Sequence, residues 1–194
     1  ASVVRAVRAS GHPATLVSRP EEVRTAERVL LPGVGNFGPA ARTLETTGLG
    51  EAVREVARAG RPVMGICLGL QLFFELSEEA PDARGLGLLP GRVQRFTTAL
   101  PVPHVGWAKV DLTEFGSRHP LLGTAFREPA EFFYHVHSYH PTAMPESHVL
   151  ATGDYGGRFP TLVGAGPVIG AQFHPEKSQQ AGLALLAAFA EWQP

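Results

Sequence analysis

The residues with the clearest chemical potential surround the single cysteine of the chain. Cys67 occupies the middle of a G-I-C-L-G turn, Gly65–Gly69, between an apolar run typical of a buried strand and a helical stretch. Such a turn lifts a nucleophile out of a sheet. The adjoining helix N-terminus favours a thiolate, and the backbone N–H of Leu68 would face a developing oxyanion. The alternative interpretation is an inert cysteine in the core.

A second set of reactive side chains lies near the C-terminus, in the sequence Q-F-H-P-E-K-S at residues 172–178. Residues two apart on extended chain share a face, and Pro175 biases His174 toward an extended conformation. Glu176 can therefore orient the His174 imidazole, which gives the base that a cysteine nucleophile needs. A solvated turn before a final helix is the alternative.

A glycine-rich loop, G-V-G-N-F-G at Gly33–Gly38, has the spacing of a dinucleotide-binding turn. That site also needs an acidic residue about 20 positions on, at the end of the next strand. Glu51 and Glu55 fall inside a predicted helix instead, so the fingerprint is incomplete. We favour a loop that brings backbone N–H groups, notably that of Val34, toward the cysteine.

Histidines recur in the segment Y-H-V-H-S-Y-H, residues 134–140. His135, His137 and His140 have a spacing that could bind zinc, but the segment holds no Asp, Glu or Cys to complete a ligand set. The preferred interpretation is the substrate-binding end of a strand, formed by His137, Ser138 and Tyr139.

The order of predicted elements indicates how these residues are positioned. Strands and helices alternate in the first half and short strands follow one another in the second, which predicts an α/β sheet with a parallel part and a β-rich half. Ser2 is the expected cap of the first helix, Gly11 its stop, and Ser178 the cap of the last helix. Expected strands cover 14–18, 28–32, 62–66, 92–96, 105–112, 132–139, 148–152, 161–165 and 168–173, and further helices cover 39–46, 49–59 and 68–76.

Composition excludes several classes of protein. The 194 residues suit one domain spanning 1–194, and the net charge of −1 argues against nucleic-acid binding. No apolar run reaches the ~18–20 residues of a membrane span. One cysteine permits no intrachain disulfide, and no apolar core of a signal peptide is present, so we expect a cytoplasmic protein.

Taken together, these features resemble the class I (triad-type) glutamine amidotransferases, over nearly the whole chain. The cysteine turn and His-Pro-Glu are shared by the whole class. The P-H-V-G-W and V-H-S-Y stretches point to the glutaminases of histidine biosynthesis. The matching stretches are 31–38, 65–75, 103–107, 136–139 and 172–178.

The resemblance implies a flavodoxin-like three-layer fold, with a mixed, mainly parallel sheet, and no cofactor or metal. Cys67 would be the nucleophile and His174 the general base and acid, oriented by Glu176. The backbone N–H groups of Val34 and Leu68 would donate hydrogen bonds to the oxyanion. The glutamine pocket would include Gly33, Gly35, Gln71, His137, Ser138 and Tyr139, and the partner interface Trp107 and Lys177.

The implied reaction is hydrolysis of glutamine to glutamate and ammonia. The implied partner is a (β/α)₈-barrel cyclase, which uses the ammonia to form imidazole glycerol phosphate. Two alternatives remain open: the amidotransferase component of another synthase, such as one for anthranilate, GMP or pyridoxal phosphate, and an interaction subunit without catalysis.

Two departures from the family pattern stand out. Ala108 follows the tryptophan, where the subfamily has Asn. The family also opens with a β-strand and a Gly-Asn loop, whereas this sequence begins at the following helix. Without a central parallel strand, backbone groups on both neighbours would be unpaired. We therefore expect a protein of this sequence to be unstable or to aggregate.

Overall fold

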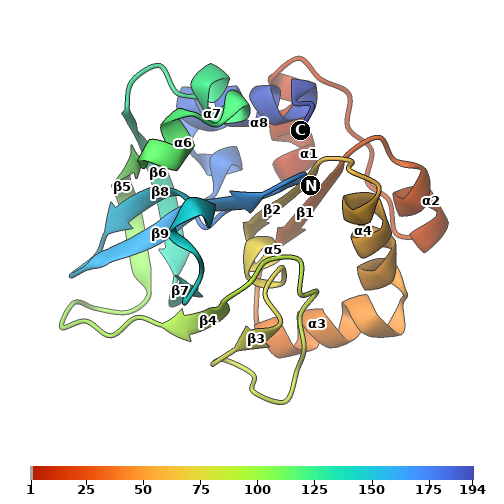
Figure 1. Cartoon of the computed structure of the whole chain (residues 1–194), viewed down its shortest axis with the longest axis horizontal. Helices are drawn as coiled ribbons and strands as arrows, with labels where there is room; N and C mark the ends of the chain where they lie inside the picture. Colours follow the sequence, from red (N-terminus) through yellow and green to blue (C-terminus); the bar gives the residue numbers. More distant parts are fainter. Residues whose placement is uncertain (1) are drawn as a thin grey trace.

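A seven-stranded sheet forms the centre of the computed structural model, which describes residues 2–194 (Figure 1). The strand order is β1-β2-β10-β9-β8-β5-β6. β1, β2 and β10 run parallel, and the remaining neighbours pair antiparallel, which confirms the predicted mixed α/β sheet with a β-rich half. The expectation that this sheet is mainly parallel was wrong, because the antiparallel strands of the second half extend the same sheet and supply four of its six neighbour pairs within residues 2–194. The strands are β1 (Val29–Gly33), β2 (Val63–Cys67), β5 (His104–Leu112), β6 (Ala130–His137), β8 (Val149–Asp154), β9 (Arg158–Ala165) and β10 (Val168–Ala171).

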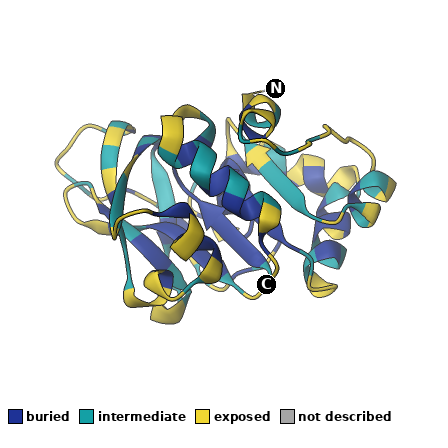
Figure 2. Ribbon diagram, turned by 90° about the horizontal axis from the view of Figure 1, so that it is seen from above, coloured by how far each residue is buried: buried dark blue, intermediate teal, exposed yellow. Residues whose placement is uncertain are grey.

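Helices cover both faces of this sheet, which gives three layers (Figure 2). Successive strand residues point to opposite faces, so Met64 of β2 packs in one core and Val63 in the other. The first core lies under α1 (Ser2–Ala9), α7 (Pro120–Ala125) and α8 (Gln179–Glu191). The second lies under α2 (Pro20–Thr25), α3 (Phe37–Thr46), α4 (Leu49–Arg58) and α5 (Leu68–Gln71).

A second, smaller sheet lies beside the main one and contains β3 (Leu76–Ser77), β4 (Arg92–Arg95) and β7 (Tyr139–Thr142). β7 begins two residues after β6 ends, so the chain changes sheets at Ser138. This change replaces the single strand predicted for 132–139. The remaining short elements are α6 (Glu114–Ser117) and the 3₁₀ helices η1 (Glu146–His148) and η2 (Pro175–Lys177).

Three local predictions were wrong. Residues 14–18 form no strand, because an apolar groove separates them from the outer edge of β1 and they make no ladder with it. The helix predicted for 68–76 ends at Gln71, where bonds between residues three apart tighten the chain into a turn toward β3. Ser178 precedes α8 but does not cap it, because its hydroxyl donates to the His174 carbonyl and accepts from the Tyr134 N–H.

The outer edge of β1 borders an apolar groove of about 700 Å³. Within residues 2–194, β1 pairs with β2 and with no other strand. The segment 13–17 forms the opposite wall, and Leu16 in it is 75% exposed. β1 is therefore an edge strand whose open side is apolar. No helix within residues 2–194 combines the length and apolar character that a membrane span requires.

Candidate active site

Cys67 lies on a strained turn between β2 and α5. Its backbone has φ 53° and ψ −109°, a conformation that side-chain-bearing residues rarely adopt. Glycine is required on both sides of Cys67, because neighbouring backbone atoms leave no room for a side chain at Gly65 or Gly69. A Cβ at Gly65 would lie 2.6 Å from the Leu70 nitrogen, and one at Gly69 would lie 1.8 Å from the Leu31 oxygen. The two glycines thus allow α5 to pack against β1 and β2 with the cysteine at its start.

His174 and Glu176 form the pair predicted from sequence. The His174 Nδ1 atom lies 2.8 Å from Oε1 of Glu176, and both side chains are buried. The backbone N–H of His174 donates to the Tyr134 carbonyl, and Ser178 holds the His174 carbonyl 2.6 Å from its hydroxyl. These bonds fix the segment 174–178 to β6 at Tyr134. The second ring nitrogen of His174, Nε2, can then interact with Cys67.

The surroundings of His174 favour its protonated form. Burial alone would lower the pKa of His174, but hydrogen bonds and charge interactions with Cys67 and Glu176 outweigh burial and raise that pKa to about 9. An imidazolium beside a sulfur atom is the arrangement that stabilises a thiolate. A protonated His174 would therefore favour a thiolate at Cys67.

A cavity of about 390 Å³ opens at these side chains. Its wall contains most of the residues predicted from sequence: Val34, Gly35, Cys67, Leu68, Gln71, His137, Ser138, Tyr139, His174 and Lys177. Glu176 lies behind His174 and lines the groove beside β1 instead. Gly33 also lies in that groove rather than in the cavity, since it ends β1 beneath the loop.

Two buried glutamines lie at the cavity: Gln71 lines it, and Gln172 contacts both Gln71 and the Cys67 sulfur. The Gln71 amide donates to the Tyr139 carbonyl at 3.1 Å and to the side-chain oxygen of Gln172 at 3.2 Å. Gln172 in turn directs its amide nitrogen at the Cys67 sulfur, 3.8 Å away. Gln172 lies in the Q-F-H-P-E-K-S stretch, but no role for it was predicted from sequence. Its position two residues before His174, on the same face of an extended chain, was the available signal.

The loop between β1 and α3 forms the rim of the cavity. Val34 is 82% exposed, and Gly35 has φ 96°, which glycine adopts without strain. A carboxylate oxygen of Glu79 accepts the N–H of Phe37 at 2.8 Å and holds the loop where α3 begins. Glu79 was not predictable from sequence, because 42 residues separate it from Phe37 and no local pattern joins the two.

The two residues predicted to face a partner lie close to a common neighbour. The Trp107 ring lies 6.3 Å from that of Tyr134, centroid to centroid, and the Lys177 ammonium lies 5.6 Å from the Tyr134 centroid. Trp107, Val105 and Phe132 are each about half exposed. This group forms an apolar surface on β5 and β6, and Lys177 connects it to the cavity.

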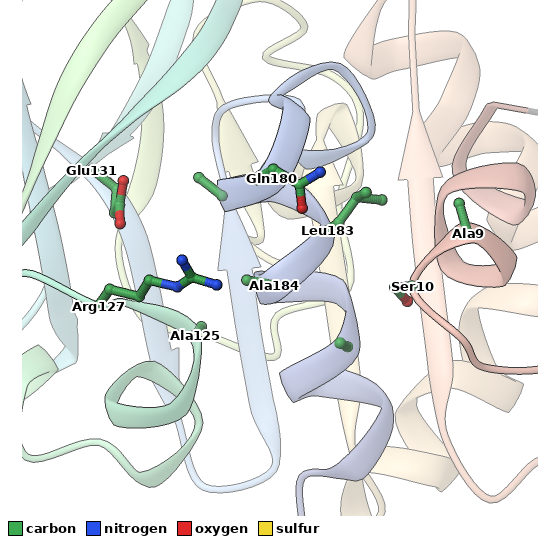
Figure 3. Close-up of a pocket in the computed structure, with 10 residues that line it drawn as sticks. Ala9, Ser10, Ala125, Arg127, Glu131, Gln180, Leu183 and Ala184 are labelled. Atoms are coloured by element: carbon green, nitrogen blue, oxygen red, sulfur yellow. The ribbon is translucent and has the colours of Figure 1, made fainter.

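A separate hollow of about 440 Å³ lies between α1, α8 and the start of β6 (Figure 3). Arg127, Glu131 and Gln180 provide its longer polar side chains, and Ala125 and Ala184 are among its small ones. The Ser10 hydroxyl is used in a hydrogen bond to the Val7 carbonyl. No residue predicted to act in catalysis lines this hollow.

The geometry is that of a cysteine amidohydrolase, and comparison with known proteins gives the family. The model of the family described as glutamine amidotransferase class-I matches residues 1–191. The chain belongs to this family. This amidotransferase is 46% identical over 188 residues to the imidazole glycerol phosphate synthase subunit HisH of Symbiobacterium thermophilum, with 96% of this chain and 86% of the relative covered. It is 42% identical over 194 residues to the same subunit of Bacillus subtilis, with 97% and 89% covered.

Solved structures resemble the amidotransferase in fold. A crystal structure of a glutamine amidotransferase superposes with a TM-score of 0.73 at 20% identity, covering 96% of this chain and 92% of that chain. PurLQS from Thermotoga maritima gives a TM-score of 0.75 at 18% identity, covering 97% and 90%. These likenesses confirm the predicted fold class.

Proposed function

We propose that this amidotransferase is the glutaminase subunit of an imidazole glycerol phosphate synthase, and that it delivers ammonia to a cyclase subunit. The observation that carries the chemistry is the strained Cys67 turn and His174 in one cavity, with Glu176 buried behind the imidazole at 2.8 Å. The HisH relatives support the choice of synthase, and their description as subunits supports a partner.

Acylation begins with attack of the Cys67 thiolate on the carboxamide carbon of glutamine. The new C–S bond places negative charge on the amide oxygen, and the N–H groups of Leu68 and Val34 stabilise it. His174 then donates its proton to the amide nitrogen as the C–N bond breaks and ammonia leaves. Glu176 keeps the imidazole oriented and stabilises its positive charge through the 2.8 Å contact.

Hydrolysis of the thioester regenerates the enzyme. Neutral His174 takes a proton from water, whose oxygen attacks the acyl carbon, and the C–S bond breaks to release glutamate and the thiolate. The same imidazole thus acts as acid in the first step and base in the second. Gln71 and Gln172 hold the wall of the cavity while these charges move.

We infer the surface that binds the partner from the apolar side chains exposed on β5 and β6. Val105, Trp107 and Phe132 present apolar side chains to solvent on neighbouring strands, next to the cavity in which ammonia forms. A cyclase subunit seated here would receive ammonia with little exposure to solvent. Lys177 lines the cavity and stacks over Tyr134 of the same surface, which makes it the contact between the two.

The test is a glutaminase assay with and without the cyclase and its nucleotide substrate. We expect glutamate release, covalent labelling of Cys67 by an electrophilic glutamine analogue, and formation of imidazole glycerol phosphate only when both subunits are present. Cys67→Ser should lose both glutaminase activity and labelling, while added ammonia restores cyclase turnover. Full glutaminase activity in Cys67→Ser would overturn the mechanism. Co-purification with a different synthase, and not with a cyclase, would overturn the choice of partner.

A further inference from the structure

A cluster of three buried histidines lies beside the glutamine cavity. We propose that His104, His135 and His137 bind a divalent transition-metal ion of the Zn²⁺ type. Within residues 2–194, these are the three potential ligand side chains whose nitrogen atoms lie within 4.8 Å of one another. The sequence alone pointed to His140 as the third histidine. The structure replaces it with His104, because His140 stacks on Phe96 and directs Nδ1 at the Pro141 carbonyl.

Strand pairing explains why the three rings meet. His104 begins β5 and is the cross-strand partner of His137, which ends β6. His135 precedes His137 by two residues, so both side chains point to the same face of the sheet. The cluster therefore rests on paired strands rather than on loops, and two separate stretches of sequence contribute to it.

The spacing suits a metal site after a small closure. His135 Nδ1 lies 3.1 Å from His137 Nε2. Two nitrogen ligands of tetrahedral zinc, each at roughly 2.0–2.1 Å from the ion, lie about 3.3 Å apart. His104 is farther away and stacks on His135, so this ring must turn toward the other two when the ion binds.

Hydrogen bonding within the cluster is incomplete. His104 Nδ1 and His135 Nε2 are buried and have no partner within residues 2–194. His137 Nδ1 lies 2.8 Å from the Tyr139 carbonyl, so it donates there and leaves Nε2 as an acceptor. If His135 donates to that acceptor, its own Nε2 lone pair has no donor. If His135 Nδ1 carries no proton, its lone pair and that of His137 Nε2 face each other at 3.1 Å. A cation bound between these two nitrogen atoms would remove this repulsion.

The rings are held in the form that binds metals. All three rings are buried, and burial favours the neutral imidazole over the charged one. Neutral imidazole is the ligand for zinc and for similar ions such as Co²⁺. Since His137 also lines the glutamine cavity, an ion and a fourth ligand such as hydroxide have a path to the site.

Binding would stiffen the wall of the cavity. The Tyr139 carbonyl that accepts from His137 also accepts from Gln71, so a metal on His137 fixes both contacts. The inferred site does not depend on the identity of the synthase or on the reaction of Cys67.

The test uses Cys67→Ser, which removes the thiolate as a competing zinc ligand. We expect this variant to bind one Zn²⁺ per chain by calorimetry, to gain thermal stability with Zn²⁺, and to give a visible absorption spectrum of tetrahedral Co²⁺. Adding His135→Phe or His104→Gln should weaken binding by at least the roughly 10–100-fold that loss of a supporting partner costs. Adding His140→Ala is the matched control and should leave Zn²⁺ binding unchanged.

His135→Phe also separates loss of a ligand from loss of folding. His135 lies between Phe159 and Phe173, so a phenyl ring fits its surroundings and removes an unmatched nitrogen. We expect this variant, free of metal, to melt at or above the temperature of its parent. The proposal is overturned if Cys67→Ser binds no Zn²⁺, if binding survives both His135→Phe and His104→Gln, or if His140→Ala abolishes it.

Discussion

Cys67 combines reactivity with a backbone conformation that opposes folding. Its positive φ costs on the order of 1–3 kcal/mol for a residue with a side chain, and the packing of α5 against β1 sustains it. The type of residue and its glycine spacing were readable from sequence. The contact of Glu79 with the Phe37 N–H was not, because it joins residues 42 positions apart. Spacing places Gln172 on the face of His174, but its contact with the Cys67 sulfur joins residues 105 positions apart and was not readable.

Replacing Cys67 separates catalysis from stability. Cys67→Ala and Cys67→Gly should both lose glutaminase activity, since neither has a thiol. Cys67→Gly should be more stable than Cys67→Ala by about 1 kcal/mol, because glycine adopts positive φ without strain. Thermal melts should place the Gly variant roughly 2–4 °C above the Ala variant. Equal melting temperatures would show that the turn is not strained.

The raised pKa of His174 makes stability depend on pH. The ordinary pKa of histidine is 6.5, and in the folded protein it is about 9. Protonation therefore stabilises the folded state fully below about pH 6.5, and the benefit is lost as pH rises through 9. Glu176→Gln removes one cause of the raised pKa. The stability difference between wild type and Glu176→Gln should shrink from pH 6 to pH 10 in urea titrations, and a difference that grows with pH contradicts the assignment.

At the scale of elements, apolar patterning predicted the strands well and helix lengths less well. β2 and β10 are buried on both faces, and their apolar runs are visible in sequence. The end of α5 at Gln71 was not predictable, because the apolar residues that follow suit a helix and a buried turn equally. The change of sheet at Ser138 depends on β4, which pairs with β7 and lies about 45 positions earlier.

The packing of α5 against β1 should tolerate no added side chain. Gly69→Ala would place a methyl group 1.8 Å from the Leu31 oxygen and force the helix away from the strand, at a cost of about 3 kcal/mol or more. Gly123→Ala is the matched control, because Gly123 is exposed in α7 with nothing within 4 Å. It should be neutral or stabilise by about 0.5–1 kcal/mol. Urea unfolding of both variants measures the contrast, and similar values would contradict it.

At the scale of the whole molecule, exposed apolar side chains gather at opposite ends of the main sheet. One group lies on β5 and β6, near the cavity, and the other borders the outer edge of β1. The first suits a protein partner. The second is the kind of open edge that favours association between chains. Within residues 2–194, β1 has one strand partner and residues 14–18 have none.

Trp107 should contribute to partner binding without contributing to folding. Its side chain is 47% exposed, so Trp107→Ala should weaken cyclase affinity by roughly 2 kcal/mol, as for an aromatic interface anchor. Leu16→Ala, at the opposite end of the sheet, is the control and should leave affinity unchanged. Calorimetric titration with the cyclase measures both. Equal affinity of wild type and Trp107→Ala would place the partner elsewhere.

Within residues 2–194 the outer edge of β1 is unpaired, so a protein made of these residues alone should associate as its concentration rises. Leu16→Lys places a charge in the groove and should reduce this association, because charged side chains protect sheet edges. Leu100→Lys replaces an exposed leucine in another loop and should have no such effect. Sedimentation velocity over a range of concentrations compares the three proteins. A wild-type chain that stays a stable monomer throughout contradicts this prediction.

The conformation of Cys67 has a consequence for selection. Because the proposed nucleophile is itself the strained residue, thermal stability and catalysis would oppose each other at one position. A library screened only for survival of heating would be drawn to glycine at position 67, and it would return robust proteins that no longer release ammonia. Any programme to stabilise this enzyme must therefore hold that codon fixed or screen for turnover at every round.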